Sequence, residues 1–302
     1  MTFDEKIVEV RTGLDAARSL HAAEVSTLKA RIAELEAQPV PVPPPPPPPP
    51  PPTGTAPKIL VENFNAGLDL QKFYLDKDGP AGSVTVSGGQ ARFSWKATSD
   101  LLDMRAQMGM RLTPGSTNET PRRDPIGSTR FYAFGIFLPP EYVFDAAWGN
   151  QKCVTGQIHQ GNAGGIVSPP FSLEMIKTSA DGEIMRGVLA LKGLITKTII
   201  IGKPPRVESK ILIHVKWSAG PDGFLKVYRD GVLTAFNHTG PTCNPRTLNG
   251  ETVDDLNHML CNYNPGRKSG SFTVGYRRDV VFTCWNIGNE TNTLADMEAA
   301  LA

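Results

Sequence analysis

From residue 58 onward, hydrophobic and polar residues alternate in short runs, which is the pattern of half-buried β-strands. Turn-forming residues separate the runs, and Ser87-Gly88-Gly89 between two of them is a hairpin signal. Strands are expected at residues 84–86, 91–95, 102–111, 130–138, 154–160, 171–176, 187–191, 196–201, 211–218, 224–229, 271–276 and 280–285. So many short strands with almost no helix predict an all-β fold of two packed sheets, a sandwich or jelly roll. The acidic end, residues 294–302, is expected to form a short helix.

The period of the pattern is different at the N-terminus, where residues 3–37 are expected to form one helix. Apolar residues recur every three or four positions, slip in phase near His21, and then resume. This is a coiled-coil seam with a stutter. An apolar stripe of this kind must be buried on another copy, on a partner, or on the main domain. Self-association through residues 3–37, or docking to a larger assembly, is favoured, because the next segment hinders the helix from folding back onto the main domain.

That next segment contains an unbroken proline run, residues 43–52. Proline fixes φ and lacks an N–H, so the run must form a polyproline II rod, and ten residues span about 30 Å. It could instead be an SH3 or WW ligand, but flanking arginines are absent. The expected organisation is a coiled-coil helix at 1–38, a polyproline linker at 39–57, and a β-domain at 58–302.

Composition excludes several classes of function. The net charge of +1 and the pI near 7.7 give no electrostatic argument for binding nucleic acid or an anionic membrane. No apolar run approaches the roughly 20 residues that span a bilayer. The first residues lack the basic and apolar regions of a secretory signal peptide. The four cysteines have no Cys-x-x-Cys spacing, which argues against zinc; Cys243 and Cys261 could pair, or all four could be reduced.

The most informative polar residues lie on the strand expected at 154–160. Successive side chains on a strand point to opposite faces. The face expected to meet the core is Val154, Gly156 and Ile158, and the opposite face is Thr155, Gln157 and His159. An amide and an imidazole would then lie side by side and could hold one ligand group. The alternative for Gln157 and His159 is a solvated strand face.

The order of five motifs resembles the jelly-roll polysaccharide lyases of the alginate, glucuronan and heparin lyase I type. The motifs are Met104-Arg105-Ala106-Gln107-Met108, residues 131–139, Gln157-Ile158-His159, the hairpin of residues 216–231, and residues 272–277. The resemblance covers about residues 58–285 and excludes the helix and the proline rod. It implies a concanavalin-like jelly roll and β-elimination on an acidic, uronic-acid polysaccharide.

The reaction explains the residue types. The proton on C5 of a uronate is hard to remove because the neighbouring carboxylate discourages a carbanion. Gln, Arg and His donors neutralise that carboxylate and stabilise the enolate-like charge. A base then takes the C5 proton and an acid protonates the leaving glycosidic oxygen. In the family, a tyrosine on the late strand usually carries out this proton transfer. These steps need no cofactor and no metal, and some relatives bind calcium.

Two departures from the family pattern affect the expected site. The early strand has Arg105-Ala106-Gln107 where the family usually has Arg-x-Glu. The family's late Lys-x-Gly-x-Tyr, aligned on Gly275, places Arg277 at the tyrosine and turns Tyr276 toward the core. The groove is therefore expected to hold Arg105, Gln107, Gln157, His159 and Arg277, with His159, Tyr263 or, after a bulge, Tyr276 as the base.

Charged loop residues leave two readings open. Arg123 lies in the Pro/Gly/Thr-rich loop around Arg122-Arg123-Asp124, which is either solvated charge or a lip over the groove, and His258 has the same status. His214, Trp217 and Trp285 are expected to be structural.

Three functions remain from the sequence: a lyase, a binding module with the same groove but no turnover, and a structural fibre or spike. The stalk favours display on a virion or an extracellular surface assembly, such as a phage fibre that meets a capsule. The combined expectation is a stalk-mounted, lyase-like domain that binds an acidic polysaccharide, with cleavage left open.

Overall fold

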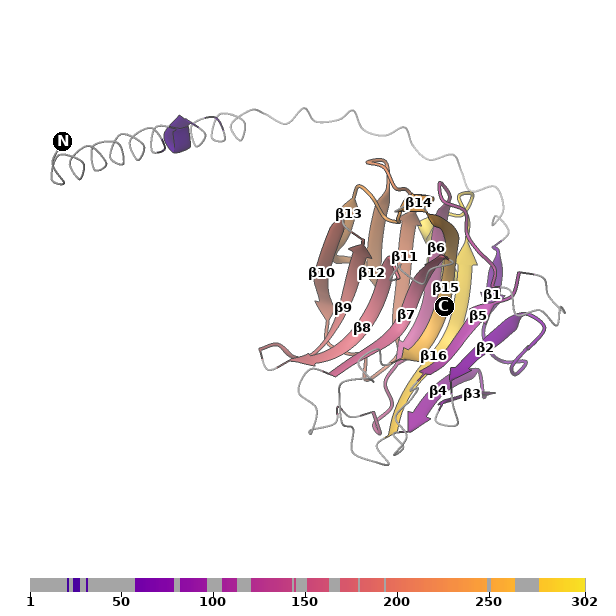
Figure 1. The fold of residues 1–302 in the computed structure, drawn as a ribbon. Helices are drawn as coiled ribbons and strands as arrows, with labels where there is room; N and C mark the ends of the chain where they lie inside the picture. Colours follow the sequence, from indigo (N-terminus) through magenta and orange to yellow (C-terminus); the bar gives the residue numbers. More distant parts are fainter. Residues whose placement is uncertain are drawn as a thin grey trace, which may run out of the picture. The chain divides into compact units, whose positions relative to one another are not determined.

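The computed structural model describes residues 58–78, 82–96, 105–112, 121–142, 144, 151–162, 169–178, 180–192, 194–248, 251–263 and 277–301, together with His21, 24–27 and Arg31. The part from residue 58 onward is built from two eight-stranded antiparallel sheets (Figure 1). This confirms the prediction of an all-β, two-sheet sandwich. Among the described residues, no helix is long and apolar enough to cross a membrane.

The first sheet has the strand order β13-β12-β11-β6-β16-β4-β3, and β1 pairs with β16. Its strands are β1 (Leu60–Glu62), β3 (Gly82–Ser87), β4 (Gln90–Lys96), β6 (Thr129–Phe137), β11 (Ser209–Lys216), β12 (Phe224–Arg229), β13 (Val232–Thr239) and β16 (Arg277–Gly288). The helix α2 (Leu294–Ala299) covers part of its outer side, where Met297 packs with Phe131 and Leu212. This helix confirms the expectation for the acidic C-terminal end, and Thr293 and Asp296 cap it reciprocally.

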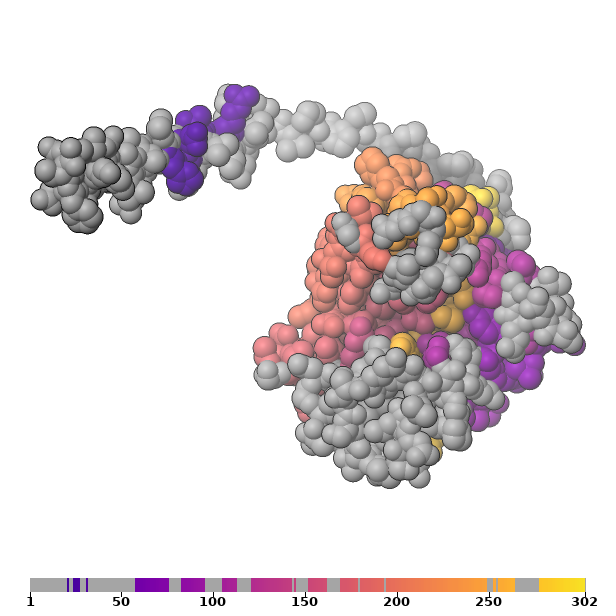
Figure 2. Space-filling model, in the orientation of Figure 1, coloured from indigo at the N-terminus to yellow at the C-terminus, as the bar shows by residue number. Residues whose placement is uncertain are grey.

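The second sheet has the order β10-β9-β8-β7-β15-β5-β2, and β14 pairs with β15. Its strands are β2 (Phe73–Asp78), β5 (Arg105–Met110), β7 (Gln151–Asn162), β8 (Phe171–Thr178), β9 (Gly182–Leu191), β10 (Ile195–Gly202), β14 (Thr247–Leu248) and β15 (Glu251–Tyr263). Atoms of β9 and β10, coloured salmon, lie at the surface in the space-filling view (Figure 2). The strand β15 lies between β7 and β5.

The core lies between the two sheets and follows from strand alternation. On β11, Ile211, Ile213 and Val215 point into it while the residues between them are less buried or face the other side. Trp217 and Trp285 are fully buried, as expected. His258, one of the two loop residues with an open reading, is instead an inner-face residue of β15. It accepts a 2.9 Å hydrogen bond from Trp285 Nε1, and burial lowers its pKa to about 3, so it is neutral near pH 7.

Asp124 is the centre of a buried polar network rather than a solvated loop residue. Its side chain is 2% exposed and accepts hydrogen bonds from Arg122 Nη2 (2.8 Å), Arg130 Nε (2.7 Å) and the Tyr132 hydroxyl (2.8 Å). Burial raises the pKa of Tyr132 well above its usual value, which keeps the hydroxyl a donor. Backbone bonds in both directions between Asp124 and Leu256 tie this loop to β15.

Several sequence predictions have other outcomes. The strands β1, β2, β13, β14 and β15 were not predicted, and β15 contains His258, which was expected in a loop. All four cysteines are free, so Cys243 and Cys261 do not pair. The strand expected at 271–276 and the proline rod lie outside the described residues. His21, 24–27 and Arg31 are helical, but the rest of the expected helix at 3–37 and the boundaries at 38 and 57 also lie outside them. The coiled coil and the domain limits remain predictions.

Candidate active site

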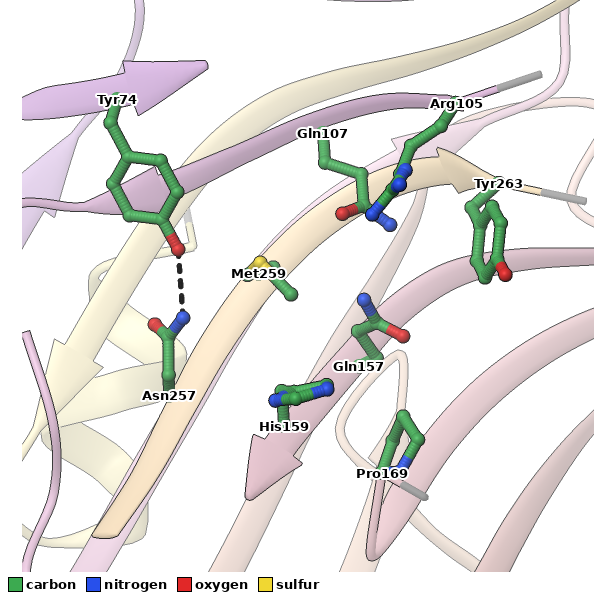
Figure 3. Close-up of a pocket in the computed structure, with 9 residues that line it drawn as sticks. All are labelled: Tyr74, Arg105, Gln107, Gln157, His159, Pro169, Asn257, Met259 and Tyr263. Carbon is green, nitrogen blue, oxygen red and sulfur yellow. Dashed lines mark hydrogen bonds between the residues drawn. The ribbon is translucent and has the colours of Figure 1, made fainter. Parts of the chain in front are cut away.

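A pocket of about 370 Å³ opens on the face of the second sheet that is turned away from the core (Figure 3). Its lining comes from three neighbouring strands, an edge strand and one loop: Tyr74, Arg105, Gln107, Gln157, His159, Pro169, Asn257, Met259 and Tyr263. These residues include one guanidinium and no carboxylate. The pocket therefore favours an anionic group.

The strands β5 and β15 supply one wall through their register. Tyr263 lies opposite Arg105, and Cys261 lies opposite Gln107. The residues between the lining positions of β5, such as Ala106 and Met108, are in the core. The Arg105 guanidinium carbon lies 5.6 Å from the centre of the Tyr263 ring, within cation–π range. This pairing places a positive charge and a phenol at one end of the pocket.

The strand β7 supplies the other wall, and a β-bulge sets its phase. Gln157 and His159 line the pocket, while Ile158 is in the core, as predicted. The register with β8 shifts between Val154 and Gly156, so the alternation expected upstream is wrong. Thr155 is fully buried, and its hydroxyl donates to the Leu173 carbonyl. Val154, expected in the core, lies on the groove side because the extra residue of a bulge reverses the faces.

The far end of the pocket is built by Tyr74 of β2 and Asn257 of β15. Tyr74 lies opposite Gly109 on β5, where a Cβ would come within 2.3 Å of the tyrosine ring. Because Gly109 has no side chain, the Tyr74 ring can lie across its backbone. The Asn257 amide nitrogen donates to the Tyr74 hydroxyl at 2.7 Å (Figure 3).

An adjoining hollow of about 340 Å³ shares Gln157, Pro169 and Tyr263 with the pocket and extends over β8 and β9. Its floor contains Glu174, which is buried between Lys152 (2.5 Å) and Arg186 (2.9 Å). Two cations thus face one carboxylate there. The two hollows together give a groove across the sheet with a positive balance. No group of three or more His, Cys, Asp or Glu that could hold a metal occurs in the part of the chain that the structure describes.

A family model described as polysaccharide lyase matches residues 81–263, more than half of the chain and most of both sheets. The chain belongs to this polysaccharide lyase family. It is therefore grouped with enzymes that cleave polysaccharides by elimination, as the resemblance implied. No curated protein sequence matches it.

Solved lyase structures share the fold at low sequence identity. An endo-β-1,4-glucuronan lyase from the fungus Trichoderma reesei is 12% identical, with a TM-score of 0.59, over 80% of this chain and 98% of its own. The alginate lyase PA1167 from Pseudomonas aeruginosa is 14% identical, with a TM-score of 0.50, over 74% of this chain and 100% of its own. At these identities the similarity concerns the jelly-roll fold alone.

In this polysaccharide lyase domain, five of the expected site residues meet in one pocket: Arg105, Gln107, Gln157, His159 and Tyr263. Arg277, expected beside them, is not there. It begins β16 in the other sheet, and its guanidinium donates to Asp279 at 2.8 Å, which raises the pKa of Arg277. Arg123 is half-buried and does not line the pocket. Tyr276 lies outside the described residues.

The alignment of the late strand explains the error at Arg277. The strand that adjoins both the Arg-x-Gln and the Gln-Ile-His strands is β15. On β15 the lyase spacing Lys-x-Gly-x-Tyr falls on Met259, Cys261 and Tyr263, so only the tyrosine is kept. Sequence reasoning missed Tyr74, Pro169, Asn257 and Met259. Alternation counted back from Tyr263 would have found Met259 and Asn257.

Proposed function

We propose that the domain binds an acidic, uronic-acid polysaccharide in the groove over the second sheet and cleaves it by β-elimination. The observation that carries this proposal is the convergence of Arg105, Gln157, His159 and Tyr263 on one pocket from three adjacent strands. Neighbouring strands lie about 4.8 Å apart, so these side chains can reach a single sugar.

Arg105, Gln157 and His159 have the chemistry to hold the uronate carboxylate. A guanidinium and an amide donate hydrogen bonds to its oxygens, and the positive charge of Arg105 offsets the negative charge that develops when C5 loses its proton. These donors are held by strands before substrate arrives, so little reorganisation accompanies the reaction.

Proton transfer is assigned to Tyr263, with His159 as the alternative base. The base removes the proton from C5, the C–H electrons form the C4–C5 double bond, and the bond from C4 to the glycosidic oxygen breaks. That oxygen takes a proton from the acid. The adjoining hollow over β8 and β9 gives the rest of the polymer room to continue past the pocket. These steps require no metal, although calcium could still bind the domain.

The direct test is to incubate the protein with alginate, polyglucuronate and heparin and to follow the near-ultraviolet absorbance of the unsaturated uronate product. A rise with at least one polymer is expected. Binding without any rise would leave a carbohydrate-binding module.

Arg105→Ala is expected to lower kcat/KM roughly ten- to hundredfold, because a charged hydrogen bond to the carboxylate contributes about 1.5–3 kcal/mol. Steady-state kinetics on the cleaved polymer measure this. Arg277→Ala is the matched control, since Arg277 lies in the other sheet and Asp279 keeps its 2.7 Å pair with Arg92. Equal losses in both variants would contradict the assigned carboxylate site.

The N-terminal segment is proposed to mount the domain on an assembly. Its apolar stripe and the proline rod support a stalk on a virion or extracellular surface, formed by several copies of the chain or docked to another protein. A peptide of residues 1–38 is expected to self-associate in analytical ultracentrifugation. A monomeric peptide together with a monomeric full chain would exclude self-association and leave docking to a partner.

A further inference from the structure

We infer that Gln107, together with Tyr74 and Asn257, forms a subsite for neutral sugar hydroxyls, which restricts the lyase to uronic-acid polymers whose hydroxyls are free rather than sulfated or etherified. The inference rests on the proposed function for the position of the sugar. It concerns lining side chains to which the elimination chemistry assigns no role.

Gln107 is the observation that carries it. The side chain is 1% exposed and lines the pocket, yet neither its amide nitrogen nor its amide oxygen has a hydrogen-bond partner among the described residues. Buried polar groups are nearly always paired, and an orphaned one destabilises the fold. A Gln107 amide retained here therefore has a ligand group as its natural partner.

The neighbouring pair, Tyr74 and Asn257, has the same character. Asn257 is buried, and its amide nitrogen donates a hydrogen bond to the Tyr74 hydroxyl. Its amide oxygen has no hydrogen-bond partner within the described structure. Met259 lies between this pair and Gln107 in the pocket lining (Figure 3). These four side chains thus present amides, a phenol and a thioether, and Arg105, the cation of the lining, lies two residues from Gln107 on the same strand, with its guanidinium beside the Gln107 amide (Figure 3).

The donor and acceptor groups of the Gln107 amide indicate which ligand groups can pair with it. Whichever way its amide is turned, Gln107 needs one donor and one acceptor from the ligand. A carboxylate or sulfate can only accept, so it would leave the Gln107 oxygen unpaired and facing negative charge. Sugar hydroxyls both donate and accept, and two adjacent hydroxyls can pair with both ends of one amide. An O-methyl group loses the donor and adds bulk.

The test uses polyglucuronate and alginate, each with free hydroxyls and after chemical O-methylation. Binding is measured by calorimetry in the Tyr263→Phe background, so that the polymer is not consumed, and thermal unfolding is measured in parallel. Gln107→Met keeps the length of the side chain and removes both polar atoms. It is expected to bind the free-hydroxyl polymer about tenfold more weakly, the loss of one or two neutral hydrogen bonds. Its Tm should stay the same or rise, because no protein hydrogen bond is lost.

Gln160→Met is the matched control on β7. Gln160 is also fully buried, but it donates to the Asn244 carbonyl at 3.0 Å and accepts from the Asn244 backbone nitrogen at 2.8 Å. This variant should have a lower Tm and bind the polymer as the parent does. The contrast between the two glutamines separates a ligand-facing amide from a structural one.

The unsubstituted protein should prefer the free-hydroxyl polymer to its O-methylated form, and Gln107→Met should reduce that preference. The inference is overturned by equal binding of the two polymer forms, by no binding of either free-hydroxyl polymer, by unchanged affinity in Gln107→Met, or by a Tm loss matching that of Gln160→Met. Failure of catalysis alone is distinguishable: the native chain would then release no unsaturated uronate while the Gln107-dependent binding persisted.

Discussion

Tyr263→Phe is expected to lower the release of unsaturated uronate roughly 10²- to 10⁴-fold, the range that a positioned proton-transfer group contributes. The phenyl ring keeps its place beside Arg105 and loses only the hydroxyl, so affinity for the polymer should remain close to that of the native protein. The initial rate of the absorbance increase measures turnover, and calorimetry measures binding.

Tyr228→Phe provides the control for Tyr263, because Tyr228 lies on β12 in the other sheet and packs against the cluster that contains Met297 of α2. It should leave turnover unchanged. If Tyr263→Phe keeps its rate while Tyr276→Phe loses it, the base belongs to the segment 271–276 and the assignment to β15 is wrong. If both keep it, His159 is the remaining base.

Asp124→Ala is expected to lower the free energy of unfolding by about 3–5 kcal/mol. The substitution removes the carboxylate that is 2.8 Å from Arg122 and 2.7 Å from Arg130, and it leaves the Tyr132 hydroxyl without its acceptor. Removing one partner of a buried ion pair costs far more than the pair contributes to stability, and after the substitution Arg130 keeps only its 2.9 Å pair with the exposed Glu290. Urea denaturation of the two proteins gives the difference.

The comparison for Asp124 is Glu183→Ala, which breaks a more exposed pair with Arg206 at 2.9 Å. Pairs of this kind contribute less than about 1 kcal/mol. A urea midpoint for Asp124→Ala that is no lower than that of Glu183→Ala would show that the Asp124 network does not stabilise the fold.

The strands that could be predicted have one apolar face toward the core and one more polar face away from it. The hairpin of β11 and β12 alternates apolar and polar residues, and one face is packed in the core, so its period of two is visible in the sequence. The strand β15 was missed because its inner face carries His258 and Asn262. Their partners, Trp285 and the carbonyls of Phe93 and Arg278, come from the opposite sheet and cannot be inferred from local pattern.

The candidate site was predicted as far as motifs lie within one strand. Arg105, Gln107, Gln157 and His159 were found because two residues on the same strand share a face. The position of Tyr263 depends on which strand lies between β5 and β7, which is a property of topology. The bulge at Thr155 could not be predicted because threonine is a common strand residue, so nothing in the local sequence marks it as the extra residue.

The contact between Tyr74 and Gly109 means that these two positions cannot vary independently. They face each other directly across β2 and β5, and any side chain at 109 would occupy the space of the ring. A natural variant with a larger residue at 109 should therefore carry a small one at 74, and Asn257 would then lose the hydroxyl that orients it. Three residues on three strands would change as one unit, so a relative's pocket shape could be read from residue 109 alone.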